Sequence, residues 1–358
     1  MRIGRRSALA LAAVASNGPA RAQARQGAVP AAWSQFRDRF VDGDGRVIDT
    51  GNGNISHSEG QGWAMLAAVR ADDRPSFERL LGWTLRTLRR DGDRLSAWRY
   101  RPAATPAVDD PNNATDGDMF IAWALLEAGA AWNAPEHAER GLAIARDILR
   151  LLVREAGPYT VLLPGARHFE TPTQTTVNLS YYAFPALRAL ASALPDPAWL
   201  RVAADGVALL RQGRFGRWRL PPDWLAIGRA DGRLSPASNW APRFSYDAIR
   251  VPLYMAWVGL EAEPAVRAAA AFWGDPGHRH LPAWADLNSN SISPYPAGAG
   301  LAAVARLVGA DRRRSGGRGT APQALALDYY SAALVLLVAL AEYDIAAITP
   351  IGGNAESP

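Results

Sequence analysis

Three acidic residues that lie far apart in the sequence stand at the start of apolar segments with the periodicity of helices. They are Glu59, Asp116 and Asp247. An acid near a helix N-terminus interacts favourably with the helix dipole, and this explains any one of the three taken alone. Three acids in the same setting indicate instead a group of carboxylates that could transfer protons.

The residues around these acids predict where the helices begin. Ser58 is a good N-cap, and Gln61 stands at the third helical position. This pairing predicts a capping box that leaves Glu59 at the first helical position. Ser245 is predicted to cap the helix that carries Asp247, and a loop rich in proline and asparagine leads into the third helix.

If the three helices point the same way, their N-termini meet at one end of the molecule and the acids form a cluster. Clustered carboxylates repel one another, so one of them retains a proton at a raised pKa, as the general acid of a glycoside hydrolase requires. The helix dipole at Glu59 opposes this rise. Burial and the neighbouring carboxylates must therefore overcome it.

The elements that would position these acids are almost all helices. Apolar residues recur at three- and four-residue intervals, with few alternating strand segments and no fixed sequence repeat. The predicted helices span residues 30–41, 58–71, 74–90, 116–132, 135–155, 185–194, 197–212, 246–259, 263–273, 296–308 and 324–343.

The distribution of apolar residues predicts two layers of helices. The segments 119–131, 251–260 and 332–341 are apolar nearly all round and should be surrounded by protein, whereas 74–90 and 135–155 have one polar face and should be outer helices. Inner and outer helices alternating in about six hairpins predict an all-α fold, an (α/α)6 barrel. A helical solenoid would need a sequence period, which is missing.

The composition excludes several kinds of chemistry. All 39 basic residues are arginine, so no Schiff-base, pyridoxal-phosphate or P-loop mechanism that needs a lysine can apply. The absence of cysteine excludes thiol catalysis, thiolate metal sites and disulfides. The serine-hydrolase G-x-S-x-G motif and a complete G-x-G-x-x-G motif are also absent. No metal or cofactor is indicated.

The first residues have the features of an export signal. Three arginines precede an apolar run over residues 8–15, followed by small residues, which predicts a signal peptide over residues 1–24 with cleavage after Ala22 or Ala24. Ordinary Sec export and twin-arginine export both remain open, with Sec slightly favoured. Cleavage removes four arginines and no acid, so the formal charge falls from +5 to +1. We therefore expect no nucleic-acid partner, no membrane span after processing, and a secreted or periplasmic protein.

The segments around the three acids resemble glycoside hydrolase family 8. Residues 114–132, with the pattern A-T-D-G-D-x-x-I-A-x-A-L-L-x-A-x-x-x-W, are similar to the family signature. Residues 58–62 (SEGQG) and 246–252 (YDAIRVP) resemble the family's acid and base segments, in the expected order. The similarity extends over nearly all of residues 25–358, which are predicted to form a single catalytic domain and, by default, a monomer.

The resemblance implies a role for each acid. It identifies Glu59 as the general acid, Asp247 as the general base and Asp116 as the residue that holds and distorts the sugar at the cleaved bond. It also implies substrate contacts from aromatic and arginine side chains, namely Trp98, Tyr181, Tyr246, Arg250, Tyr329 and Tyr330. Such a mechanism with inversion at the anomeric carbon needs no cofactor.

Several functions remain open at this stage. The resemblance favours an endo-β-1,4-glucanase like those that accompany bacterial cellulose synthase, with a β-1,4-glucan as substrate and the synthase machinery as a candidate partner. Chitosanase, lichenase and xylanase activities also occur in the family. Outside it, a polysaccharide lyase would need a strongly basic site, and a non-catalytic glucan-binding protein would need neither acid.

Two further motifs suggest metal binding but have simpler explanations. Asp42 and Asp44 open a sequence like a calcium loop, yet Gly53 stands at the twelfth position, where such a loop requires Glu. His278 and His280 form an H-x-H pair without a third histidine nearby. We predict a turn for the first motif and a solvated loop for the second.

Overall fold

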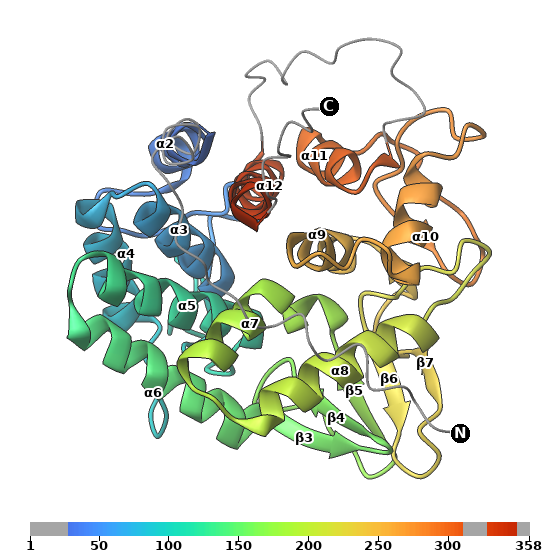
Figure 1. The fold of residues 1–358 in the computed structure, drawn as a ribbon, viewed down its shortest axis with the longest axis horizontal. Coiled ribbons are helices and arrows are strands. Elements are labelled where there is room, and N and C mark those ends of the chain that lie inside the picture. Colours follow the sequence, from blue (N-terminus) through green and yellow to red (C-terminus); the bar gives the residue numbers. More distant parts are fainter. Residues whose placement is uncertain (1–27, 311–327, 349–358) are drawn as a thin grey trace, which may run out of the picture.

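The computed structural model describes residues 28–310 and 328–348, and within them the chain is mainly helical (Figure 1). The predicted signal peptide lies outside the described residues. The α-helices are α2 (Ala28–Phe40), α3 (Ser58–Arg70), α4 (Arg74–Thr87), α5 (Thr115–Ala131), α6 (Pro135–Leu152), α7 (Phe184–Ala193), α8 (Pro197–Gln212), α9 (Arg250–Trp257), α10 (Pro264–Trp273), α11 (Ala299–Leu307) and α12 (Tyr329–Ile348).

Six of these helices form a closed inner ring. Around the ring α3 contacts α5, α5 contacts α7, α7 contacts α9, α9 contacts α11, α11 contacts α12, and α12 returns to α3. The predicted inner segments form α5, α9 and α12, and their buried residues lie all round the helix because neighbours surround them. The fold is the (α/α)6 barrel that the sequence predicts.

The outer helices pack on the ring through one apolar face. α4 contacts α3, α6 contacts α5, α8 contacts α7, α10 contacts α9, and α2 covers α12 and α3 (Figure 1). In α6 the buried residues recur at helical intervals, from His137 through Gly141, Ile144 and Ile148 to Leu152, while the opposite face carries arginine and acidic side chains. The predicted two-faced helices are therefore outer helices.

Four of the inner helices, α3, α5, α9 and α12, run in the same direction. At their C-terminal ends Arg70 of α3 forms ion pairs with Glu127 of α5 and Asp344 of α12. The indole N–H of Trp257, the last residue of α9, donates to the same Asp344 over 2.8 Å. The network closes this end of the ring, and it leaves the N-termini of the same helices together at the other end.

Short strands, which the helical periodicity did not reveal, form four small antiparallel sheets. Strand β3 pairs with β4, β5 with β6 and β6 with β7, while two two-residue pairs join β1 to β2 and β8 to β9. The strands are β1 (Ser56–His57), β2 (Arg99–Tyr100), β3 (Val153–Ala156), β4 (Tyr159–Leu162), β5 (Gln174–Val177), β6 (Leu225–Gly228), β7 (Leu234–Pro236), β8 (Arg243–Phe244) and β9 (Ala285–Asp286).

Several predicted helix boundaries differ from the structure, and two of the differences have the same cause. The helix predicted over 135–155 ends at Leu152, because Val153 begins the strand β3, which pairs with β4 in a hairpin. Val153 is β-branched, and such residues favour strands. The helix predicted to begin at residue 246 begins at Arg250, because the preceding residues form a turn held from outside the helix. Tertiary contacts override the local pattern in both places.

Helix α12 is long and apolar enough, by length and composition, to cross a membrane. Half of this segment is buried inside the structure, where α12 packs against α2, α3, α9 and α11. Its Asp344 binds Arg70 at the far end of the ring. Burial in the inner ring therefore accounts for its apolar composition.

Candidate active site

The N-termini of α3 and α5 are in direct contact. A side chain at Gly117 would lie 2.4 Å from the hydroxyl of Ser58 and 2.8 Å from the backbone nitrogen of Glu59, so only glycine allows this approach. The contact places Glu59, on the first turn of α3, beside Asp116, on the first turn of α5. The predicted meeting of helix N-termini is thus present.

Arg250 joins the third acid to this pair. Its guanidinium, nearly fully buried, donates from Nη1 to Oδ2 of Asp116 over 2.9 Å and from Nη2 to Oδ1 of Asp247 over 2.6 Å. Asp116 is fully buried, whereas the side chain of Asp247 is 27% exposed. The planar guanidinium of Arg250 therefore binds two carboxylates at once, the buried one of Asp116 and the solvent-accessible one of Asp247.

Asp247 lies in a turn before α9 and not on the helix itself. The turn begins after β8, and the prediction that Ser245 caps the helix is wrong. The Ser245 hydroxyl donates to Asp223 over 2.7 Å, and the amides of Ser245 and Ala248 donate to the same carboxylate over 2.9 and 2.8 Å. Asp223 is not among the predicted site residues, since a lone acid between Pro222 and Trp224 gives no signal of its target.

The predicted capping box at α3 does not form. The N-cap residue of α3 is His57, without a side-chain cap bond, and Gln61 points into the core. There its amide accepts from the backbone of Val47 over 2.6 Å and donates to the Thr84 hydroxyl over 2.9 Å. Gln61 therefore fixes the packing of α3 against the 45–47 loop and α4 instead of closing its own first turn.

Burial is the main cause of the protonation behaviour of the cluster. It raises the pKa of Glu59 above the ordinary glutamate value, and the carboxylate of Asp247 adds to the rise while Arg250 opposes it. Burial, followed by the charge of Glu59, raises the pKa of Asp116 well above its usual range, again against Arg250. Glu59 remains partly exposed at the surface. It can therefore hold a proton and still reach a ligand.

Two of the predicted substrate-binding residues lie directly at this cluster. The ring of Tyr181, in the 3-10 helix Leu179–Tyr182, lies 5.7 Å from the guanidinium carbon of Arg250. Burial and then the charges of Asp116 and Glu59 raise the pKa of Tyr181 well above its usual range. The side chains of Tyr181 and Arg250 therefore lie next to the acidic residues.

Trp98 and Tyr246 lie at the edges of the cluster. Trp98 is partly exposed and stacks near His57, with ring centroids 6.2 Å apart, and its carbonyl accepts from the amide of Ser58 over 3.1 Å. Tyr246 is 51% exposed, and its hydroxyl lies 3.3 Å from that of Tyr295. Their contacts with substrate remain predictions.

The two tyrosines at the start of α12 make contacts within the protein. The hydroxyl of Tyr330 donates to the backbone carbonyl of Tyr246, so it holds the turn that carries Asp247. Tyr329 is only 4% exposed, and its ring packs on Phe36 and Phe40 with centroids 5.9 and 5.6 Å away. Core contacts occupy the Tyr329 ring, and the substrate contacts of Tyr329 and Tyr330 remain predictions.

Other partly exposed aromatic residues were not predicted. Phe169, Trp224 and Trp240 form a column in which neighbouring rings are nearly parallel, with centroid distances of 5.7 and 4.5 Å. Trp224 also meets the ring of Tyr181 edge-on at 6.0 Å. The column therefore meets Tyr181, which stands beside the acids, at its middle ring. The only sequence signal was that these residues stand in or beside proline- and glycine-containing loops.

The chain matches glycosyl hydrolases family 8 over residues 6–344. It belongs to glycosyl hydrolase family 8. A probable endoglucanase of Novacetimonas hansenii is 47% identical, over 88% of this chain and 91% of that protein. An endoglucanase of Cellulomonas uda is 44% identical, over 77% of each chain. The structure of the endo-β-1,4-glucanase CMCax from Acetobacter xylinum superposes with a TM-score of 0.82 at 46% identity, covering 88% of this chain and 98% of that one.

Membership of family 8 makes the protein a glycoside hydrolase, and the acid cluster is its candidate active site. Among the described residues, no three His, Asp or Glu side chains gather in a way that could hold a metal ion. Asp42 and Asp44 accept from the backbone amides of Gly43 and Arg46 within their own turn. The calcium-loop resemblance there corresponds to a turn.

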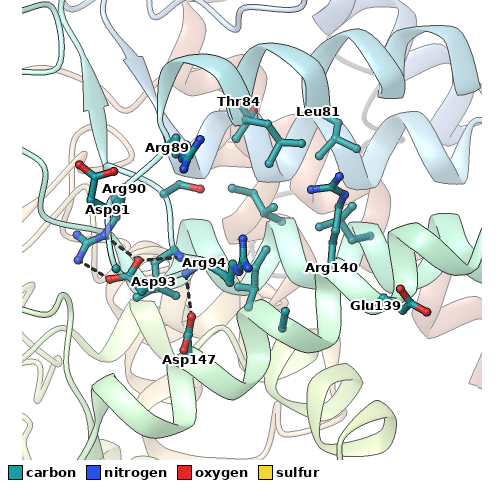
Figure 2. Close-up of a pocket in the computed structure, with 18 of the residues that line it drawn as sticks. Leu81, Thr84, Arg89, Arg90, Asp91, Asp93, Arg94, Glu139, Arg140 and Asp147 are labelled. Atoms are coloured by element: carbon teal, nitrogen blue, oxygen red, sulfur yellow. Dashed lines mark hydrogen bonds and ion pairs between the residues drawn. The ribbon is translucent and has the colours of Figure 1, made fainter.

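A cavity of about 850 Å³ lies elsewhere in this family 8 protein, between α4, α5, α6 and the 89–96 loop (Figure 2). Its rim carries both signs of charge, and Arg90 and Arg150 are already paired with Asp93 and Asp147. None of the three clustered acids lines it. On chemical grounds the acid cluster is the better candidate, because there two carboxyl groups of raised pKa, Glu59 and Asp116, lie beside the solvent-accessible Asp247.

Proposed function

We propose that the protein is an inverting endo-β-1,4-glucanase of the cellulase type. The observation that carries the proposal is the joining of Glu59, Asp116 and Asp247 through contacting helix N-termini and the fork of Arg250. The substrate is inferred from the relatives described above, a probable endoglucanase, an endoglucanase and an endo-β-1,4-glucanase, which match most of this chain.

In the proposed reaction Glu59 donates a proton and Asp247 accepts one. Glu59 donates its proton to the glycosidic oxygen as the bond from that oxygen to the anomeric carbon breaks. Asp247 accepts a proton from the water whose oxygen forms the new bond on the other face of the sugar. The raised pKa of Glu59 supports its role as the donor, and the exposed fraction of Asp247 supports contact with water.

Asp116 and Arg250 are proposed to act on the sugar between these groups. Asp116 is fully buried and ion-paired, so it is held in one position. A fixed carboxylate can accept hydrogen bonds from sugar hydroxyls and favour a distorted ring, which lowers the barrier when the contact is stronger in the transition state. Tyr181, Trp98 and Tyr246 are the proposed contacts for neighbouring sugar units.

The substrate assignment is tested by measuring reducing-end release from four polymers: carboxymethylcellulose, lichenan, xylan and chitosan. We expect the highest kcat/KM on carboxymethylcellulose and a rapid fall in its viscosity, since internal cleavage shortens chains quickly. Faster hydrolysis of chitosan or xylan would replace the glucanase assignment. Binding of cellulose without hydrolysis of any polymer would favour a glucan-binding protein.

We further propose that the protein is exported and acts on glucan made by a cellulose synthase in the same cell. The arginines, apolar run and small residues within residues 1–24 support export. The test compares the full chain with a variant that lacks residues 2–24, by fractionation of the producing cells. We expect the full chain in the periplasm or medium and the shortened chain in the cytoplasm. An unchanged location would contradict the proposed signal.

A further inference from the structure

Asp223 lies at the junction of a sheet with the turn that carries Asp247. It lies two residues before the central strand β6 of the sheet β5–β6–β7, between Pro222 and Trp224. Its backbone amide donates to the carbonyl of Arg243 in β8 over 2.7 Å. The residue is buried, with a relative exposure of 9%. Its position is therefore fixed by strands on both sides.

The Asp223 carboxylate accepts three hydrogen bonds from the turn. Oδ1 accepts from the amide of Ser245 over 2.9 Å and from the amide of Ala248 over 2.8 Å, and Oδ2 accepts from the Ser245 hydroxyl over 2.7 Å. The donors stand on both sides of Asp247 in the sequence. Bonds to a carboxylate are stronger than bonds between neutral groups, so the backbone around Asp247 is held firmly.

Asp247 lies before α9, in a turn whose own backbone bonds leave two amides without a partner in the turn. The amides of Ile249 and Arg250 donate to the carbonyls of Ser245 and Asp247 over 3.0 Å, whereas the amides of Ser245 and Ala248 are satisfied only by Asp223. Arg250 restrains the Asp247 carboxylate and Tyr330 restrains the carbonyl of Tyr246, but neither binds the amides of the turn. Asp223 supplies those acceptors. A misplacement of about 1 Å at a reacting group can cost on the order of 100-fold in rate.

We propose that Asp223 is a positioning residue that fixes the turn 245–248, and through it the direction of Asp247 toward the attacking water. The inference rests on the proposed role of Asp247 as the base. Asp223 itself accepts no proton from water in this scheme, because both of its oxygens are occupied by donors of the turn.

Two variants separate hydrogen bonding from charge. Asp223→Asn loses the charge, but its oxygen can still accept both amides and its NH2 group can donate to the Ser245 hydroxyl. Asp223→Glu keeps the charge but moves the carboxylate by one methylene group. We expect Asp223→Asn to retain kcat on carboxymethylcellulose within about 3-fold, and Asp223→Glu to lose on the order of 10- to 100-fold in kcat with little change in KM.

The outcomes separate a positioning role from other roles. A larger loss of kcat in Asp223→Asn than in Asp223→Glu would overturn the proposal, because charge would then matter more than geometry. An Asp223→Asn variant as inactive as Asp247→Asn would also overturn it, since Asp223 would then be a proton acceptor. Ser245→Ala, which removes only the bond to Oδ2, serves as the matched control and should lose less than Asp223→Glu.

Hydrogen–deuterium exchange gives a readout that does not depend on activity. We expect faster exchange of the Ser245 and Ala248 amides in Asp223→Glu, with unchanged exchange in α3 and α5. Unchanged exchange at these two amides would overturn the proposal. If the parent protein hydrolyses no β-1,4-glucan, the proposed function fails, while the exchange result still decides whether Asp223 holds the turn. If Asp223→Glu does not fold, the kcat of Asp223→Asn decides alone.

Discussion

Nη2 of Arg250 donates to Oδ1 of Asp247, three residues earlier in the chain, over 2.6 Å. The same guanidinium binds the buried Asp116 through Nη1. The carboxylate proposed as the general base is therefore oriented by a guanidinium, which keeps its own proton. The bond from Nη1 to Asp116 connects this orientation to the first turn of α5.

Removing either proposed proton-transfer group should nearly abolish catalysis. We expect Glu59→Gln and Asp247→Asn each to lower kcat by about 10²- to 10⁴-fold, the usual contribution of a general acid or base. Reducing-end release under saturating substrate measures this. Glu136→Gln is the matched control, because Glu136 also stands in the first turn of a helix but on the exposed side of α6. Full activity in either site variant would remove that residue from the mechanism.

The pH dependence should reflect the protonation of Glu59. The acid acts when protonated, and burial raises its pKa above the ordinary glutamate value. Activity should therefore persist at pH values where an ordinary glutamate is ionised, and fall only as the pH rises through the higher pKa. The upper limb of the kcat/KM profile measures it. A limb at the ordinary value of about 4.3 would contradict the buried donor.

Asp118 should make the free energy of unfolding depend on pH. Burial raises its pKa to about 8, although Ser96 and Asn113 donate to its carboxylate. The folded state thus favours the protonated form, whose stabilisation is complete below the unfolded pKa and is lost as the pH rises toward 8. Urea unfolding should give lower stability at pH 9 than at pH 5, with a weaker dependence in Asp118→Asn. Equal slopes would exclude this residue as the cause.

The ion-pair network at the closed end of the ring should support stability without affecting chemistry. Arg70→Met leaves Glu127 and Asp344 without their shared cation, and such losses cost about 3–5 kcal/mol in unfolding free energy. Arg74→Met breaks the exposed pair with Glu78 and should cost about 1 kcal/mol or less. Denaturant unfolding compares the two. Equal losses, or a reduced kcat in folded Arg70→Met, would contradict this division.

The inner and outer helices could be predicted because burial leaves a direct mark on the sequence. A helix surrounded by neighbours, such as α5, is apolar nearly all round, whereas α6 keeps one polar face. The cluster of Glu59 and Asp116 followed from the same pattern, since acids at the starts of inner helices that run in one direction must meet. Both features depend on local sequence and on one simple packing rule.

The support of the site could not be predicted, because it depends on contacts between distant residues. Gln61 has the spacing of a capping residue, but a buried amide finds better partners in the loop at Val47 and in Thr84. Asp223 binds a turn more than twenty residues further along the chain, and nothing in its neighbours indicates that target. Local patterns do not specify such pairings.

The anomeric configuration of the first product tests the proposed mechanism most directly. Proton NMR of cello-oligosaccharide hydrolysis by the parent protein, recorded before mutarotation, reads this configuration at the newly formed reducing end. An acid at Glu59 and a base at Asp247 acting through one water predict the α-anomer as the initial product. An initial β-anomer would show retention through a covalent intermediate and would contradict the assignment of Asp247 as the base.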